Sequence, residues 1–279
     1  MTSAFDIADL HTHTTASDGR DAPLALVQRA QSMNLAAIAI TDHDTVDAHL
    51  SLSVDPPPAL QIIPGIELSA NVGMSEVHVL GYFIDVTSSY LTDQLEALRK
   101  QRMKRVERFC ARLTELDLPL TIDEVLVQAT GESVGRPHIA RAMIEHGYVS
   151  SVNEAFERYL AGGRPAFVPR VDITPEASIE LIHKSGGVAV LAHPFTTGDP
   201  AGMMNRLLSV GLDGAEVEYG SYAETEREEL RAMAQARALI PTGGSDFHGA
   251  DHRECTPLGA GGVSLDVVER LRQRSEQYR

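Results

Sequence analysis

The 279-residue sequence predicts an α/β fold in which about seven strands form a closed or nearly closed barrel. Short, continuous apolar runs alternate with segments of helical character, which is typical of a parallel sheet covered on both faces. This alternation stops between residues 90 and 173, where no convincing strand occurs. The length and the 43% hydrophobic content suffice for one large core, and barrels of this size commonly form a single domain.

The predicted strands are the apolar runs, taken in chain order. They cover residues 7–10, 36–41, 62–67, 77–83, 188–192, 215–218 and 239–242. The first helix has Pro23 at its start, where the missing N–H does no harm, and it runs to about residue 33. Thr174 is expected to cap a helix that ends at Gly186 and Gly187. Further helices are predicted at residues 201–210, 223–237 and 265–274.

The segment without strands is predicted to be a helical insertion. Leucines and other apolar residues recur at spacings of three and four over residues 91–117, which indicates one long amphipathic helix. Shorter helices fit residues 122–130, 137–147 and 152–160. We therefore expect a barrel formed by residues 1–89 and 174–279 and an insertion, residues 90–173, that acts as a substrate-binding lid.

Charge and composition limit the classes of partner. The net charge of −15 disfavours duplex nucleic acid, although a small phosphorylated ligand still suits a cationic pocket. Cys110 and Cys255 suggest no disulfide framework. Residues 1–7 do not resemble a signal peptide, and no apolar run reaches the length of about 18 residues that spans a membrane. We expect a cytoplasmic protein without a membrane partner.

Histidines and carboxylates occur in six short clusters, each beside an apolar run. The clusters are Asp9-Leu10-His11-Thr12-His13 with Asp18, Thr41-Asp42-His43-Asp44, Gly65-Ile66-Glu67, Glu76-Val77-His78, Ala192-His193-Pro194 and Gly244-Ser245-Asp246-Phe247-His248. In parallel barrels, functional side chains project from the carboxyl ends of the strands. His78 lies near the start of its run, so its strand is expected to begin earlier or to bend there.

These residue types favour a multi-metal hydrolase site. Imidazole and carboxylate suit hard-to-borderline divalent ions, and His11 and His13, two apart in extended chain, can bind one ion. Glu67 can bridge two ions, and ions about 3.5–4 Å apart can clamp an in-line displacement at phosphorus. His193 and Asp246 could instead be turn residues, but six polar clusters together favour metal because unsatisfied buried polar groups cost free energy.

Other polar residues receive weaker predictions. Asp44 is expected to cap a helix that begins near Val46 rather than to bind metal. Phe195 and Tyr222 are candidates for stacking on a base. Residues expected at the surface or at helix ends are His49, His146, His183, His252, Asp213, Asp251 and Glu218, of which Glu218 could also support a ligand.

The motifs DLHTH, TDHD, GIE and GSDFH, in this order, resemble the polymerase and histidinol phosphatase (PHP) family of metal-dependent phosphoesterases. The resemblance covers residues 7–84 and 186–250 and implies a distorted (β/α)7 barrel. It also implies three divalent metal ions per chain, manganese before iron or zinc. The implied ligand sets are His11, His13, Glu67 and Asp246; Asp18, His43 and His248; and Glu67, His78 and His193, with Glu67 bridging.

The insertion contains Gly135-Arg136-Pro137-His138-Ile139-Ala140, which resembles an element of nucleoside 3′,5′-bisphosphate phosphatases. The resemblance implies that Arg136 and His138 bind phosphate, and an arginine fork suits phosphate oxygens. Alternatively, Arg136 is only an exposed residue before a helix. Most cations of the long helix are expected to pair with nearby glutamates, but Arg102 or Arg105 could reach over the pocket.

The resemblance implies a phosphatase in which a metal-bridging hydroxide attacks the 3′-phosphate of a nucleoside 3′,5′-bisphosphate such as pAp. The products are a nucleoside 5′-monophosphate and phosphate. The alternative is a 5′→3′ exoribonuclease that acts on short single-stranded RNA at the same site. The insertion motif disfavours a histidinol phosphate phosphatase. Every ligand position that the resemblance implies holds a suitable residue, which disfavours a noncatalytic barrel. The TDHD and GSDFH motifs do not fit an amidohydrolase.

Overall fold

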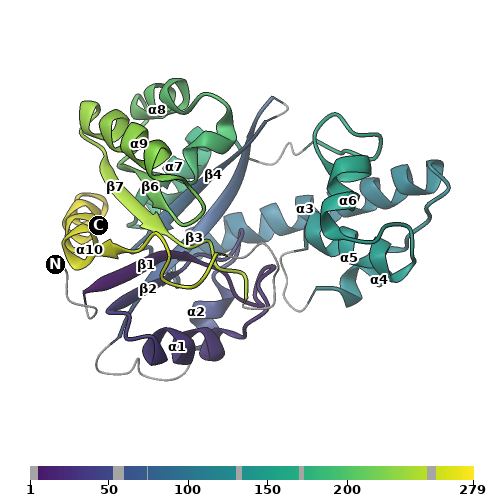
Figure 1. The fold of residues 1–279 in the computed structure, drawn as a ribbon, viewed down its shortest axis with the longest axis horizontal. Helices are drawn as coiled ribbons and strands as arrows, with labels where there is room; N and C mark the ends of the chain where they lie inside the picture. Colours follow the sequence, from purple (N-terminus) through teal and green to yellow (C-terminus); the bar gives the residue numbers. More distant parts are fainter. Residues whose placement is uncertain (1–5, 53–59, 74, 130–133, 170–172, 250–255) are drawn as a thin grey trace.

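The computed structural model describes residues 6–52, 60–73, 75–129, 134–169, 173–249 and 256–279, so Asp251, His252 and Cys255 lie outside the described residues. It confirms a mixed α/β fold with a nearly closed, distorted barrel (Figure 1). The strands are β1 (Ile7–Thr12), β2 (Ala37–Ile40), β3 (Gln61–Val72), β4 (Ser75–Tyr82), β5 (Val188–Leu191), β6 (Gly214–Tyr219), β7 (Ile240–Gly244) and β8 (Val263–Ser264). No helix in the described part of the chain is both long and apolar enough to cross a membrane.

The sheet has the strand order β7-β6-β5-β4-β3-β2-β1-β8. Strands β1, β2 and β3 are parallel neighbours, as are β5, β6 and β7. Beyond the ends of β1 and β7, the His13 backbone N–H donates to the Phe247 carbonyl oxygen at 2.9 Å. The barrel is therefore drawn together at the edge where the predicted functional clusters lie.

The expectation of a wholly parallel sheet is wrong at two strands. Strand β4 runs antiparallel to β3 and β5, and the additional strand β8 runs antiparallel to β1. Only two residues separate Val72 from Ser75, whereas a parallel crossover needs about a dozen or more. The short connection therefore forces a hairpin.

The β3–β4 hairpin also corrects the expected end of the third strand. Strand β3 continues past Glu67 to Val72, and Ser69 pairs with His78 across the hairpin. Because side chains alternate along a strand, Glu67, Ser69, Glu76 and His78 share one face. Strand β4 begins at Ser75, ahead of His78 as expected, and its antiparallel direction brings this first half of the strand to the functional edge.

Helices cover the outside of the barrel (Figure 1). They are α1 (Pro23–Ser32), α2 (Asp47–Ser51), α7 (Pro175–Lys184), α8 (Pro200–Leu208), α9 (Glu224–Ala236) and α10 (Leu265–Ser275). The Thr174 side chain accepts a hydrogen bond from the Ala177 N–H, so the predicted cap of α7 is present. Fully buried Leu10, Ile63 and Leu80 belong to the barrel core.

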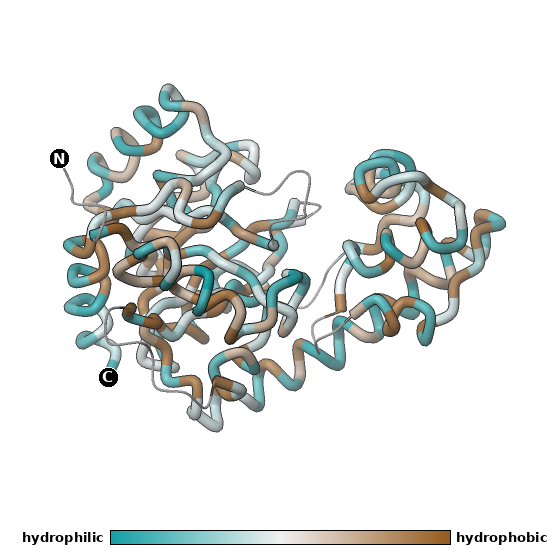
Figure 2. Tube along the Cα trace, turned by 60° about the horizontal axis from the view of Figure 1, so that its bottom comes forward, coloured by the Kyte–Doolittle hydropathy of each residue, from teal (hydrophilic) through white to brown (hydrophobic). Residues whose placement is uncertain are grey.

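The insertion has an apolar core of its own. It contains α3 (Ser89–Glu115), α4 (Ile122–Val127), α5 (Arg136–Glu145) and α6 (Val152–Ala155), followed by a π-helical turn at Phe156–Leu160. The first turns of α3 bury Leu91 and Leu95 in the barrel, whereas Phe109 and Leu113 belong to the insertion core. Figure 2 shows hydrophobic segments inside both parts, with the long helix running between them. Helix α3 thus ties the insertion to the barrel.

Asp213 was expected at the surface, but this expectation is wrong because the residue is buried beside β5. Its carboxylate accepts hydrogen bonds from the Ala189 N–H and the Tyr278 hydroxyl, and it pairs with His183 and Arg274. These contacts fasten the C-terminal helix to the barrel.

Other weakly predicted residues have local partners. His49 lies in the last turn of α2 with its Nε2 2.9 Å from the Ile40 carbonyl oxygen, and His146 caps the end of α5. Glu218 pairs with Arg231 of α9, away from the predicted ligands.

Candidate active site

The strand ends bring nine predicted residues into one group, which we term the cluster. It contains His11, His13, Asp18, His43, Glu67, His78, His193, Asp246 and His248. Glu67 is almost fully buried at its centre. The sequence places these residues far apart, so the barrel supplies their proximity.

One part of the cluster surrounds a point between two imidazoles and two carboxylates. The Nε2 atoms of His11 and His13 lie 3.4 and 3.3 Å from Glu67 Oε2. The same atoms lie 3.3 and 3.0 Å from Asp246 Oδ1. Ligand atoms held tetrahedrally about 2.0–2.1 Å from an ion lie about 3.3–3.4 Å apart. The spacing therefore fits a single divalent ion.

A second group lies around Asp18. Its carboxylate oxygens are 3.8 Å from His43 Nε2 and 3.3 Å from His248 Nε2. His13 approaches the same carboxylate with its Nδ1 at 4.0 Å. Together with His13, these three residues offer ligand atoms that all lie within 4.8 Å of one another, so the group could hold another ion.

Glu67 connects these groups with a third. Its Oε1 lies 2.8 Å from His78 Nδ1 and 3.1 Å from His193 Nε2, while its Oε2 lies 2.9 Å from His43 Nδ1. His43, Glu67 and His78 offer ligand atoms within 4.8 Å of one another, and His193 lies beside them at the same Glu67 oxygen as His78. A carboxylate with different imidazoles at its two oxygens has the geometry of a bridging ligand.

The cluster also concentrates buried atoms without hydrogen-bond partners in the described part of the chain. Six of them are His11 Nε2, His13 Nδ1 and Nε2, His43 Nδ1, Glu67 Oε2 and His78 Nε2. Each such atom is costly unless it is satisfied, and lone pairs gathered at one place suit cations. The donor set therefore fits divalent metal ions.

Several carboxylates that support the cluster were not predicted. Glu216 Oε1 lies 2.9 Å from His11 Nδ1, and its Oε2 accepts a hydrogen bond from the His193 N–H at 2.7 Å. A hydrogen bond at Nδ1 leaves Nε2 of His11 available as a ligand atom. The sequence signal for Glu216 was a carboxylate inside an apolar strand, but a register shift between Glu216 and Glu218 turns Glu218 toward Arg231 of α9 instead.

Asp9 and Asp42 hold the surrounding backbone. Asp9 accepts hydrogen bonds from the Ser245 N–H and hydroxyl, which fixes the end of β7 against β1. Asp42 accepts from Thr14 and from the Ser17 hydroxyl, which positions the loop that carries Asp18. The ligand atoms are thereby oriented before any ion binds.

Asp44 does not cap a helix, contrary to expectation. Helix α2 begins at Asp47 without a side-chain cap, and Asp44 instead accepts a hydrogen bond from the Ser69 N–H and pairs with Arg102 of α3. Asp44, His193 and Asp246 all have positive φ angles, at 54°, 25° and 54°. Sparsely populated backbone conformations of this kind concentrate at functional sites, where they turn a side chain inward.

A cavity of about 110 Å³, which we term the rim cavity, separates the cluster from the insertion. The cluster side contributes Asp18, His43 and His78, and the insertion side contributes Arg102, Arg105, Arg136 and His138. All four substrate-binding candidates named from the sequence therefore line one space with predicted metal ligands. Arg136 is not merely an exposed residue, because it pairs with Glu76 of β4 and lies over the Phe156 ring.

His138 lines the rim cavity as a neutral donor. Burial lowers its pKa to about 4, and nearby Arg141 and Arg102 act in the same direction against Asp18. Its Nδ1 accepts the Gly135 N–H, which leaves the hydrogen on Nε2. The ring can therefore donate a hydrogen bond to a phosphate oxygen at neutral pH.

Comparison with known proteins agrees with this geometry. Residues 9–239 match the family model described as PHP domain. The chain belongs to the PHP domain family. It is 38% identical over 249 residues to the 5′-3′ exoribonuclease Rnm of Escherichia coli, covering 87% of this chain and 85% of that protein.

Two further relatives also match over most of the chain. The chain is 29% identical to the 3′,5′-nucleoside bisphosphate phosphatase of Chromobacterium violaceum, with 86% of each protein covered. A crystal structure assigned as a metal-dependent phosphoesterase of Bifidobacterium adolescentis superposes with a TM-score of 0.81, 29% identity and 96% coverage of both chains. This PHP protein is a metal-dependent hydrolase of phosphoric esters.

The PHP site has a cation near Asp18 that the sequence analysis missed. Arg141 of α5 donates from Nη2 to the Asp18 carbonyl oxygen at 3.2 Å. It lies three residues after His138, so it shares a face of the helix with that residue. The three-residue spacing from His138 is the sequence feature that could have identified Arg141 as a site residue. Arg141 adds another positive charge beside the cluster.

Metal binding to this PHP domain is expected to release protons. Burial lowers the pKa of His78, but Glu67 and Glu76 outweigh it and raise the value to about 10. Burial also lowers the pKa of His248, and Asp18 and Asp246 raise it to about 10. Both rings are thus protonated at pH 8 without metal, whereas a metal ligand must be neutral.

We expect manganese titration of the metal-free protein at pH 8 to release at least two protons per chain. The release can exceed two because the pKa of His11 is also raised above its usual value: burial lowers it, but Glu216, Asp246 and Glu67 outweigh burial. The apparent affinity should rise with pH, because fewer protons then need to be displaced. A weakly buffered indicator dye measures the release directly, and His78→Gln should release about one proton fewer. Uptake of metal without proton release, or tighter binding at lower pH, would contradict this account.

Proposed function

We propose that this PHP protein removes the 3′-phosphate of nucleoside 3′,5′-bisphosphates and gives a nucleoside 5′-monophosphate and phosphate. One observation carries the proposal: the rim cavity has predicted metal ligands on one side and Arg136 and His138 on the other. A substrate with two phosphates can place one at the cluster and the other against the insertion. A monophosphate uses only half of this arrangement.

The residues of the chain perform distinct tasks in this proposal. The cluster residues would hold metal ions, which would supply an activated water molecule and neutralise charge on the phosphoryl oxygens. Arg136 offers a planar fork of N–H donors, held in place by Glu76 and the Phe156 ring. His138 donates from Nε2 to the same phosphate. These contacts orient the nucleotide so that its 3′-phosphorus lies at the cluster.

A 5′→3′ exoribonuclease activity is the second candidate. The 38% identity to the Rnm exoribonuclease of Escherichia coli favours it. Both reactions break the bond between phosphorus and the 3′ oxygen of a nucleotide that carries a 5′-phosphate. They differ only in whether the 3′-phosphate continues into a longer chain. One site can therefore serve both substrates, provided that the RNA is short and single-stranded.

We also propose three metal ions per chain, with manganese as the working ion. Three groups of ligand atoms, linked to one another through His13 and His43, support this number. Mixed imidazole and carboxylate sites accept manganese, iron or zinc, and availability in the cell decides among them.

A substrate panel with manganese tests the proposed function. We expect pAp to be hydrolysed roughly 100-fold or more faster than 5′-AMP, because the second phosphate is held by charge-assisted hydrogen bonds that 5′-AMP cannot form in the productive orientation. Phosphate release and chromatographic detection of 5′-AMP measure the reaction. Equal rates on both substrates would refute the proposed specificity while leaving the phosphoesterase activity in place.

A further inference from the structure

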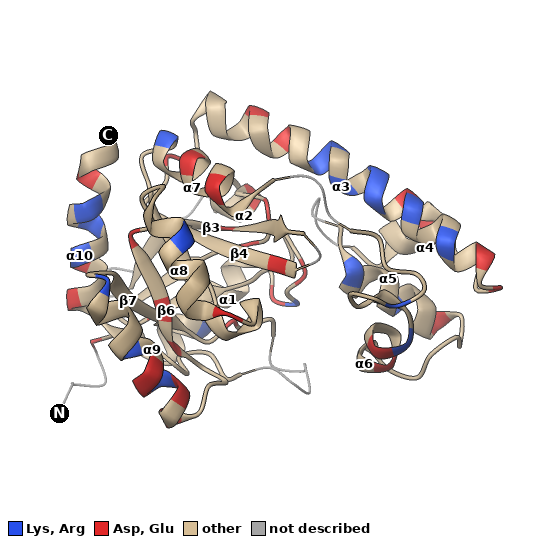
Figure 3. Cartoon of the chain, turned by 90° about the horizontal axis from the view of Figure 1, so that it is seen from above, with Lys and Arg blue, Asp and Glu red and all other residues tan. Residues whose placement is uncertain are grey.

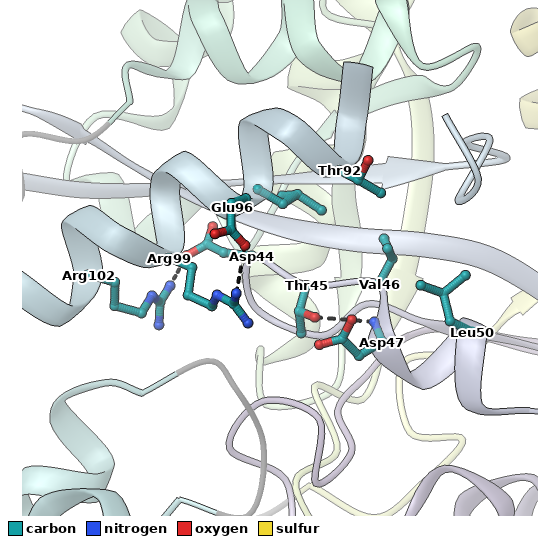
Figure 4. A pocket seen from close by; sticks show the side chains of 10 residues that line it. Asp44, Thr45, Val46, Asp47, Leu50, Thr92, Glu96, Arg99 and Arg102 are labelled. Carbon is teal, nitrogen blue, oxygen red and sulfur yellow. Dashed lines mark hydrogen bonds and ion pairs between the residues drawn. The ribbon is translucent and has the colours of Figure 1, made fainter. Parts of the chain in front are cut away.

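The rim cavity adjoins a second hollow along α3. This hollow, which we term the side pocket, has a volume of about 330 Å³ and includes Asp44, Val46, Leu50, Leu95, Arg99 and Arg102 in its lining. Arg102 lines both spaces, and its ion pair with Asp44 forms the partition between them. Figure 4 shows Arg99 and Arg102 extending from α3 toward the segment that carries Asp44 and Thr45.

A third hollow follows on the far side of the side pocket. This α3 groove, about 570 Å³, is lined by Glu96, Arg99, Lys100, Lys104 and Leu126 among others. It shares Glu96 and Arg99 with the side pocket. The three hollows therefore follow one another along α3, and each shares lining residues with the next.

The side pocket suits an uncharged, flat group. Most of its charged side chains neutralise one another, because Asp44 pairs with Arg102 and Glu96 pairs with Arg99. Asp47 is the one further charge among the described residues of the lining. Leu50 is an exposed apolar side chain on its wall, at 55% exposure, and Val46 and Leu95 add further apolar surface. Small-molecule sites commonly combine apolar walls with a few polar groups at volumes of about 300–1,000 Å³. A nucleobase fits this chemistry better than a phosphate does.

The α3 groove, in contrast, suits phosphates. Arg99, Lys100 and Lys104 line it beside Glu96 and Glu107, and residues 96–112 of α3 as a whole contain seven cationic and two anionic side chains in a protein of net charge −15. Lys100, Lys104 and Arg108 are four residues apart, so they lie on one face of α3 with a rise of about 6 Å between neighbours. Figure 3 shows Lys and Arg along much of the helix. Such a local concentration of positive charge attracts a polyanion.

We propose that the side pocket and the α3 groove bind the second and later nucleotides of a single-stranded RNA. Its first nucleotide then occupies the rim cavity. The proposal rests on the proposed function, since the RNA must present its 5′-phosphate to Arg136 and its first 3′-phosphorus to the cluster. The base of the second nucleotide enters the side pocket, and the following phosphates contact Lys100 and Lys104. The contacts that favour a longer RNA over pAp therefore lie outside the catalytic residues.

The double variant Lys100→Gln, Lys104→Gln tests the proposed RNA-binding track, which consists of the side pocket and the α3 groove. The matched control is Lys184→Gln on α7, because Lys184 pairs with Glu180 at the same i,i+4 spacing as Lys100 pairs with Glu96. The measurement is kcat/KM on pAp and on 5′-phosphorylated oligoribonucleotides of increasing length, at several salt concentrations. Affinity for the longest oligoribonucleotide is measured separately by fluorescence anisotropy, in the Asp246→Asn background.

For the wild type and Lys184→Gln, kcat/KM is expected to rise with length over the first few nucleotides. The double variant should lose about tenfold on the longest substrate and less than about twofold on pAp. The slope of log affinity against log salt should shrink by about 1.4, since each phosphate contact on a single strand contributes about 0.7. Leu50→Asp should weaken the dinucleotide and longer substrates and spare pAp.

The other outcomes overturn the proposal. Equal loss on pAp and RNA, no loss on RNA, or the same loss in Lys184→Gln would show that the groove does not bind the strand. Wild-type protein that hydrolyses pAp but no oligoribonucleotide would refute the track and leave the phosphatase proposal intact. Wild-type protein inactive on both substrates would refute the proposed function itself.

Discussion

Glu67→Gln is expected to lower kcat/KM for pAp by about 10³-fold or more without unfolding the protein. Glu67 is the only residue within the described part of the chain that lies within 3.4 Å of ring nitrogens of His11, His13, His43, His78 and His193 together. A glutamine keeps the shape but loses the charge and one of two ligand oxygens. Charge stabilisation by paired ions is worth several kcal/mol, and each 1.36 kcal/mol corresponds to about tenfold in rate.

The matched control is Glu218→Gln. Glu218 lies on β6 near the same edge of the barrel, but it pairs with Arg231 of α9 instead of contacting the cluster. Its substitution should change kcat/KM by less than about threefold, as expected for a partly exposed ion pair. Metal content measured on both purified variants separates loss of metal from misfolding. Near wild-type activity in Glu67→Gln would contradict a bridging role for this carboxylate.

Arg136→Met is expected to erase the preference of the enzyme for a 5′-phosphate. Wild-type protein should hydrolyse pAp about 10- to 100-fold faster than 3′-AMP, because hydrogen bonds to a charged group contribute about 1.5–3 kcal/mol. The variant should lose this factor on pAp and change little on 3′-AMP, which has no 5′-phosphate to bind. The comparison is made in kcat/KM with manganese at saturating concentration.

Arg158→Met is a close control for this substitution. Arg158 also pairs with a glutamate, Glu154, and also lies over an aromatic ring, that of Tyr159. Arg136 differs in that it lines the rim cavity. Equal losses on both substrates in Arg136→Met, or the same change in Arg158→Met, would show that Arg136 does not recognise the 5′-phosphate.

Much of the candidate site could be predicted from the sequence because its residues follow apolar strands in short motifs. His11 and His13 share a face by strand alternation alone. Parallel strands such as β1, β2, β5 and β7 present their carboxyl ends at one edge, which gathers the residues that follow them. The amphipathic pattern of residues 91–117 likewise indicated the long helix that carries Arg102 and Arg105.

The remaining features depend on tertiary contacts that leave little trace in the sequence. Asp44 resembled a helix cap, but the buried ion pair with Arg102, 58 positions along the chain, determines its role. Glu216 and Asp213 are acidic residues within or beside apolar strands, and only the fold shows which groups satisfy them. The hairpin direction of β4 could have been inferred, because the connection before it is too short for a crossover.

A crystal structure of the manganese-loaded protein, with anomalous diffraction recorded at the manganese edge, tests whether the cluster holds three ions. We expect three anomalous peaks within about 2.0–2.4 Å of nitrogen or oxygen atoms of the cluster, with Glu67 contacting more than one. Full occupancy should coincide with maximal pAp hydrolysis by the same preparation. Peaks elsewhere on the chain, or an active protein with no metal at Glu67, would contradict this expectation.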